Sequence, residues 1–176
     1  HFINILLYGF LGIMLYKLFE IMFLRKKDTD DLRILAFITC LLFVAHPIHT
    51  EAVANIKGRD EIMTFLGAII ALWAAFKHKY SSNVKWIVLV IVSFFVALMS
   101  KENAITFLAV VPLSFFLFTK DRIGGSLTRL WPFAVSTFVF LFIRFSILGM
   151  DFGGAPNELM NNPFLKIVNN QYVDFS

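Results

Sequence analysis

The chain has 176 residues, of which 59% are hydrophobic, 16% are charged and 22 are phenylalanine. A soluble domain carries roughly a quarter charged residues, so this composition excludes an ordinary water-soluble core and indicates a chain whose solvent is lipid. The net charge of +4 does not point to nucleic acid, because the basic residues fall in short loops that set membrane orientation. We therefore expect an all-α integral membrane protein with no nucleic-acid partner.

Six apolar segments follow one another along the chain and predict about six transmembrane helices, at about residues 2–24, 33–45, 62–76, 84–99, 104–118 and 131–148. Only the first and last approach the ~20 residues that span a bilayer. The middle four are short. Either their flanking polar residues surround a pocket at the membrane boundary, or flanking lysines and arginines reach back to the interface.

Lysine and arginine are divided unequally between alternate loops. One set has ten members: Arg25, Lys26, Lys27, Arg33, Lys77, Lys79, Lys85, Lys120, Arg122 and Arg129. The other has four: Lys57, Arg59, Lys101 and Lys166. The positive-inside rule makes the first set cytosolic. The loop 46–61, the turn 100–103 and the tail from Gly149 then share the non-cytosolic face, where we expect the chemistry.

The loop HPIHTEAVANIKGRDE, residues 46–61, is the densest polar signal. Pro47 predicts a helix end or kink after His46. The spacing of His46, His49 and Glu51 suits a divalent metal, or a base with a hydrogen-bond partner. The alternative is that these side chains only satisfy backbone groups freed near the proline.

The end of that loop precedes the third apolar segment. Asp60 and Glu61 are suited to the N-cap and first turn of a helix, where the dipole favours acids. Arg59 beside a helix start makes a seat for phosphate, because its guanidinium group and free backbone N–H groups converge there.

Two further charged sites interrupt apolar sequence. Lys101 and Glu102 occupy a short turn, as either a helix-hairpin cap or site groups, and lysine can meet a phosphate as a point charge. Arg144 lies inside the last apolar segment, which makes it a functional-site hypothesis against the alternatives of snorkelling or pairing with an acid. Cations beside carboxylates at a membrane boundary suit a lipid-linked phosphate: the cations hold the leaving phosphate and a carboxylate deprotonates the acceptor.

Four stretches carry a family resemblance. The segment HPIHTEAVANIKGRDEIM resembles the HPxHTEAVA…GRAD segment of the transmembrane-and-tetratricopeptide-repeat (TMTC) family of protein O-mannosyltransferases and their bacterial relatives. SKENAIT is similar to that family's AKE-x-GIT turn, HFINILLY to its FHxxNxxLH helix start, and RFSILGMDFGGAPNELMNNPF to its R…G…P…DNP stretch. The matches run in order over nearly the whole chain.

The resemblance implies a GT-C membrane glycosyltransferase that moves a sugar such as mannose from a polyprenyl-phosphate donor to a protein or glycan hydroxyl. It assigns His49, Glu51 and Glu61 to catalysis, and Arg59, Lys101, Glu102 and Arg144 to the lipid phosphate. A divalent metal cofactor and the choice between retention and inversion stay open. The implied location is the bacterial inner membrane or the endoplasmic reticulum, with membrane lipid around the helices and the active face non-cytosolic.

The chain departs from the family pattern in several places. Asp60 stands where the family has Ala, so Glu61 takes the place of its Asp; Asn103-Ala104 replace Gln-Gly, and Asn161 replaces the Asp of DNP. The family's catalytic acid lies in a loop that would precede residue 1, and its repeat domain lies downstream. Residues 1–176 are therefore expected to be a fragment of one transmembrane domain, inactive alone.

Two functions of other classes compete with the enzyme. A transporter or flippase of an anionic lipid-linked substrate would use the same cations, but it would need paired half-helices or an inverted repeat, and neither is seen in the sequence. A non-catalytic membrane assembly protein would leave the one-sided polar cluster unexplained.

Overall fold

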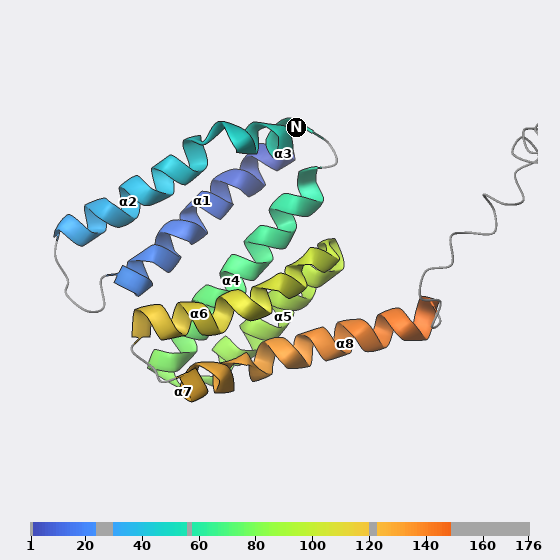
Figure 1. The fold of residues 1–176 in the computed structure, drawn as a ribbon. Helices are drawn as coiled ribbons and strands as arrows, with labels where there is room; N and C mark the ends of the chain where they lie inside the picture. Colours follow the sequence, from blue (N-terminus) through green and yellow to red (C-terminus); the bar gives the residue numbers. More distant parts are fainter. Residues whose placement is uncertain (1, 24–29, 56–57, 120–122, 149–176) are drawn as a thin grey trace, which may run out of the picture. The chain divides into compact units, whose positions relative to one another are not determined.

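A computed structural model describes residues 2–23, 30–55, 58–119 and 123–148. Every element in these ranges is a helix (Figure 1), so the predicted all-α membrane fold is confirmed. The elements are α1 (Phe2–Phe23), α2 (Asp30–Ala45), η1 (Pro47–His49), α3 (Thr50–Ala54), α4 (Arg59–Ser81), α5 (Val84–Ser100), η3 (Glu102–Thr106), α6 (Phe107–Thr119), α7 (Ile123–Leu127), η4 (Thr128–Leu130) and α8 (Trp131–Leu148).

All six predicted apolar segments are helical, but not all have the length of a membrane span. Within the described ranges, four helical segments are long and apolar enough to cross a bilayer. A fifth span results if α2 and the following η1–α3 segment, bent by 49°, count as one. Helix α5 is apolar but has 17 residues. Length and composition therefore support four or five spans, where the sequence predicted about six.

Helix α4 is longer than its apolar stretch. The sequence predicted a short segment at 62–76, whereas the helix has 23 residues and begins at Arg59. Its first turn holds Asp60 and Glu61, and its last turn holds His78 and Lys79. Acids at the start and bases at the end interact favourably with the helix dipole, so the polar flanks extend the helix. Gly58, and not Asp60 as predicted, is its N-cap.

The predicted helix boundary at Pro47 is confirmed. Helix α2 ends at Ala45, and His46 caps the next turn: its Nδ1 accepts a hydrogen bond from the Ile48 N–H at 3.2 Å. Pro47 takes the first position of that turn, where its missing N–H costs nothing. The bend carries His49 and the short helix α3 away from the α2 axis.

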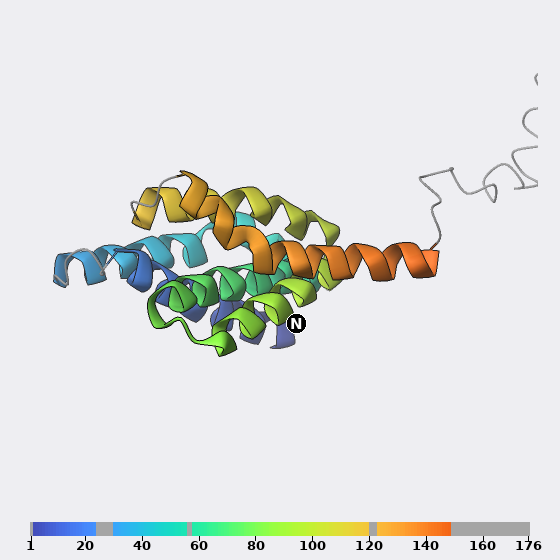
Figure 2. The same cartoon turned by 90° about the horizontal axis from the view of Figure 1, so that it is seen from below.

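Helices α4 and α5 form an antiparallel pair and lie side by side in both views (Figures 1 and 2). Gly67 permits the close approach: a Cβ there would lie 2.7 Å from the Ser93 carbonyl oxygen. Nearer the start of α4, the Thr64 hydroxyl lies 3.5 Å from the Ala97 carbonyl oxygen. This antiparallel register brings the end of α5 beside the start of α4.

Phenylalanine fills the core and also covers the outside. Phe76 stacks on Phe115 with ring centroids 4.4 Å apart, and Phe94 meets Phe133 edge-on at 5.1 Å; all four are fully buried. In contrast, Phe138 is 71% exposed, one of many large apolar side chains on the surface. Apolar side chains on both sides of a helix are typical of a protein surrounded by lipid.

The contacts divide the chain after Leu141. Residues 1–141 form one unit, which holds the candidate site. Residues 142–148, including Arg144, belong to the other.

Candidate functional site

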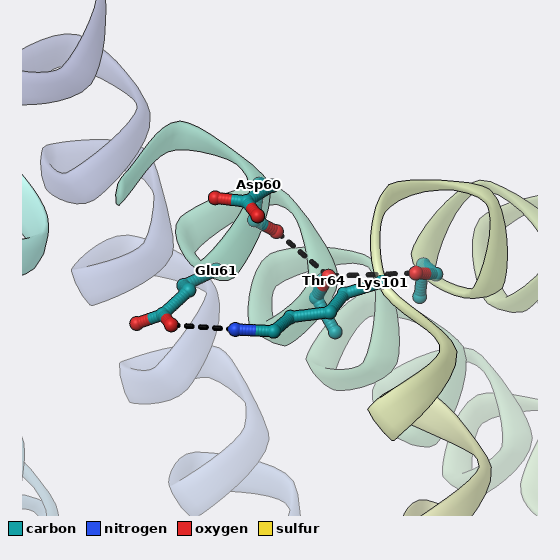
Figure 3. Close-up of polar contacts among 5 residues, drawn as sticks. Asp60, Glu61, Thr64 and Lys101 are labelled. Atoms are coloured by element: carbon teal, nitrogen blue, oxygen red, sulfur yellow. Dashed lines mark hydrogen bonds and ion pairs between the residues drawn. The ribbon is translucent and has the colours of Figure 1, made fainter. Parts of the chain in front are cut away.

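An ion pair joins two of the predicted site residues. The Lys101 Nζ lies 2.6 Å from Oε1 of Glu61, to which it donates a hydrogen bond (Figure 3). The two side chains are 37% and 56% exposed. Glu61 therefore has a partner on another helix, in addition to its place in the first turn of α4.

The end of α5 places Lys101 above the start of α4. Lys101 is the C-cap of α5, with an extended backbone (φ −157°, ψ 131°), and its N–H donates to the Ala97 carbonyl. In the same region, the Thr64 hydroxyl donates a hydrogen bond to the Asp60 carbonyl oxygen at 2.7 Å (Figure 3). The hydrogen bond to Glu61, together with the charges of Glu61 and Asp60, raises the pKa of Lys101, so its ammonium group stays charged at neutral pH.

His49 packs in an aromatic cluster near this pair. Its ring lies 4.4 Å from that of Phe43, 5.9 Å from Tyr8 and 6.0 Å from His46, measured between centroids. The cluster ties the η1 turn to α1 and α2. Tyr8 also donates to the Val44 carbonyl oxygen at 2.9 Å, which holds the last turn of α2 against α1.

His49 lines two cavities. One, of about 490 Å³, lies between α1, the end of α2 and the η1–α3 segment, with Tyr8, His46, His49 and Thr50 among mostly apolar walls. The other, of about 260 Å³, is lined by Tyr8, Phe43, Phe65, His49 and Glu61. An imidazole and a carboxylate thus face the same apolar cavity, and the carboxylate is the one that binds Lys101.

Arg59 is held by a residue outside the predicted site. Its Nε donates a hydrogen bond of 3.2 Å to Oδ1 of Asn4 in the first turn of α1. The Asn4 amide in turn donates to the carbonyl oxygens of Val53 and Asn55, at 3.3 and 3.0 Å. Asn4 is 1% exposed, while Arg59 is exposed. In the sequence, the one sign of this role is that Asn4 is a polar residue near the start of an otherwise apolar helix.

The glycine before Arg59 is required by the close passage of α3. A Cβ on Gly58 would collide with the Ala52 carbonyl group. The Gly58 N–H donates to the Asn55 carbonyl at 3.1 Å. Gly58 thus allows α3 to pack against the first turn of α4.

Three other predicted residues are Glu51 in α3, Glu102 in η3 and Arg144 in α8. Glu51 is exposed on the first turn of α3 and lines neither of the two cavities. Glu102 is exposed at the start of η3, next to Lys101. Arg144 is partly buried in α8, but in the other unit, so it has no assigned place in the site. Asn161, Lys166 and Lys57 lie outside the described residues.

The sequence left open a metal site at His46, His49 and Glu51. Among the residues that the structure describes, no three His, Cys, Asp or Glu side chains are grouped to hold a metal ion. His46 instead spends its Nδ1 on the Ile48 N–H. A divalent metal cofactor stays a prediction.

Comparison with known proteins finds several relatives that are named protein O-mannosyl-transferases. The chain is 26% identical to the protein O-mannosyl-transferase F38B6.6 of Caenorhabditis elegans over 98% of its own length, which is 24% of that protein. It is 31% identical to human protein O-mannosyl-transferase TMTC4 over 61% of the chain, and 41% identical to human TMTC1 over 40%; these regions are 16% and 7% of the two human proteins. Neither a protein-family model nor a solved structure matches the chain.

The chain therefore spans about a quarter or less of the curated relatives that it matches. The matched relatives share the name protein O-mannosyl-transferase, which agrees with the motifs in residues 46–63 and 100–106. The resemblance inferred from those motifs is confirmed: the chain is similar over nearly its whole length to a segment of F38B6.6, and over 40% to 61% of its length to segments of TMTC1, TMTC3 and TMTC4, all of them protein O-mannosyl-transferases by name.

Proposed function

We propose that the protein containing this chain is a membrane glycosyltransferase that moves a sugar, with mannose the first candidate, from a polyprenyl-phosphate donor to a hydroxyl of a protein or glycan. The observation that carries the proposal is the grouping of Lys101, Glu61 and His49 at one end of the bundle. The names of the relatives support the reaction class. The active face is proposed to be non-cytosolic, from the distribution of basic residues.

In the proposed reaction, the acceptor oxygen forms a bond to the anomeric carbon of the sugar. The bond between that carbon and the phosphate oxygen breaks, and polyprenyl phosphate leaves with the bonding electrons. The acceptor proton passes to a carboxylate base, and cations stabilise the charge that develops on the leaving phosphate. Either stereochemical outcome is compatible with this balance.

The roles proposed for the residues follow from their chemistry. Lys101 and Arg59 neutralise the lipid phosphate, with Glu102 beside Lys101 at the edge of that site. His49 and Glu51 are assigned to orienting the acceptor or the catalytic acid. Glu61 holds Lys101 in place before the donor binds, and its carboxylate faces the cavity beside His49.

The test is transfer from radiolabelled polyprenyl-phosphate mannose to a mixed protein acceptor, using the full-length protein in detergent. Label should reach protein with the wild type and not with Lys101→Ala. Equal transfer by both would remove Lys101 from the site. A wild type that binds the donor without transferring label would favour the flippase alternative, and a wild type that binds no lipid-linked sugar would end the enzyme proposal.

A further inference from the structure

We infer that Asn4 is a positioning residue for Arg59: it fixes the guanidinium group so that the edge carrying the two terminal nitrogens is presented to an oxyanion. The inference rests on the proposed function, because the oxyanion is taken to be the donor phosphate. Asn4 itself is buried and does not contact the donor in this proposal.

The amide of Asn4 has a single orientation that satisfies its neighbours. Its nitrogen faces two carbonyl oxygens, of Val53 and Asn55, and its oxygen faces the Arg59 Nε–H. Rotating the amide by 180° would set oxygen against two oxygens and an N–H against an N–H. The three partners therefore determine which atom meets the guanidinium, and a buried amide with all three bonds made is a rigid anchor.

The bond to Nε decides what Arg59 can do. A guanidinium group is planar, and one edge is formed by its two terminal nitrogens. With Nε engaged by α1, that edge remains for a bidentate contact with a phosphate oxygen pair, the geometry for which arginine is suited. Arg59 is exposed, so the edge is accessible. Lysine at the same position would keep the charge but has no Nε–H for Asn4 to accept.

Asn4 also connects the elements on which Arg59 depends. Val53 lies in α3, Asn55 caps the end of α3, and Arg59 is the first residue of α4. One side chain of α1 thus bonds to both helices that flank this position. Loss of the amide would release Arg59 and leave two carbonyl oxygens without these donors.

The experiment is a titration of the full-length protein in detergent with polyprenyl phosphate without sugar, for wild type, Asn4→Leu, Arg59→Lys and the double variant. A positioning role predicts that Asn4→Leu weakens binding roughly tenfold when Arg59 is present. With Arg59→Lys in place, the same substitution should change the Kd by less than about twofold, the range of independent sites.

Ser136→Ala is the matched control. It removes another buried hydrogen bond within residues 1–141, from the Ser136 hydroxyl to the Ile91 carbonyl oxygen at 3.1 Å. It should lower the thermal midpoint without changing the Kd. If Asn4→Leu does not accumulate as folded protein, Asn4→Ser, whose shorter side chain cannot reach Arg59 in the same way, replaces it in the cycle.

Two outcomes overturn the inference separately from the proposed function. Equal weakening by the Asn4 substitution in the Arg59 and Arg59→Lys backgrounds would mean that Asn4 acts only through the fold. Unchanged binding in Asn4→Leu, with Arg59→Lys weakened, would mean that Arg59 needs no anchor. If wild-type protein does not bind polyprenyl phosphate at all, the proposed function fails and the inference fails with it.

Discussion

The Nζ of Lys101 and the Oε1 of Glu61 meet at 2.6 Å, although the two residues are 40 positions apart in the chain. The contact exists because α4 and α5 are antiparallel and closely packed at Gly67. Before any donor binds, the Glu61 carboxylate therefore holds the Lys101 ammonium group, a cation suited to binding phosphate.

Exchanging the charges of Lys101 and Glu61 distinguishes an effect on stability from an effect on sugar transfer. In Lys101→Glu combined with Glu61→Lys, an ion pair can re-form, so the thermal midpoint should stay close to that of the wild type, as is usual for an exposed pair. Transfer should still be lost, because the cation has moved to α4. The measurements are the midpoint and transfer of labelled mannose. Recovery of transfer in the exchanged protein would mean that only the pair, and not the position of the cation, matters.

The pH dependence of donor binding should not arise from Lys101 near neutrality. Folding gives this lysine a partner and raises its pKa above the ordinary value of a lysine. The ion pair therefore contributes to stability fully below the unfolded-state pKa of Lys101, and this contribution is lost as pH rises through the folded-state pKa. The measurement is the Kd for the donor as a function of pH. Wild type and Lys101→Arg should have pH profiles of the same shape from about pH 6 to 9. The two profiles should diverge only above the pKa of Lys101, because arginine keeps its proton there. Divergence near pH 7 would contradict this assignment.

Substitutions of His49 distinguish packing from proton chemistry. Phenylalanine keeps the ring contact with Phe43, so His49→Phe should fold with a near wild-type midpoint, whereas His49→Ala should lose about 1 kcal/mol of ring stacking. Both should lose transfer if the imidazole orients the acceptor or the catalytic acid. Full transfer by His49→Phe would leave His49 only a packing role.

Gly58→Ala should destabilise the protein, by about 1–3 kcal/mol or more, since the added Cβ meets the backbone of Ala52 and backbone cannot rotate away. Gly9→Ala is the control: it is also a glycine-to-alanine change, but nothing lies within 4 Å of the added atom. Helix propensity alone would then make Gly9→Ala neutral or stabilising by up to ~1 kcal/mol. Thermal unfolding in detergent compares the two, and equal midpoints would show that α3 does not pack on Gly58.

Several features of the site follow from local sequence. The apolar segments predicted the helices, and Pro47 predicted the end of α2, because both depend on residues close in the chain. The motifs in residues 46–63 and 100–106 predicted the similarity to protein O-mannosyl-transferases. The length of α4 was underestimated because acidic and basic residues at its two ends are equally compatible with a helix and with a loop.

The tertiary structure alone decided which polar groups meet. Sequence placed Arg59 and Lys101 on one face but could not choose their partners, because those come from helices that are far apart in the chain. The antiparallel register of α4 and α5 brings Glu61 within hydrogen-bond distance of Lys101. The packing of α1 brings Asn4 within hydrogen-bond distance of Arg59. Spacing along a chain determines contacts within one helix, whereas contacts between helices depend on how the side chains of both pack together.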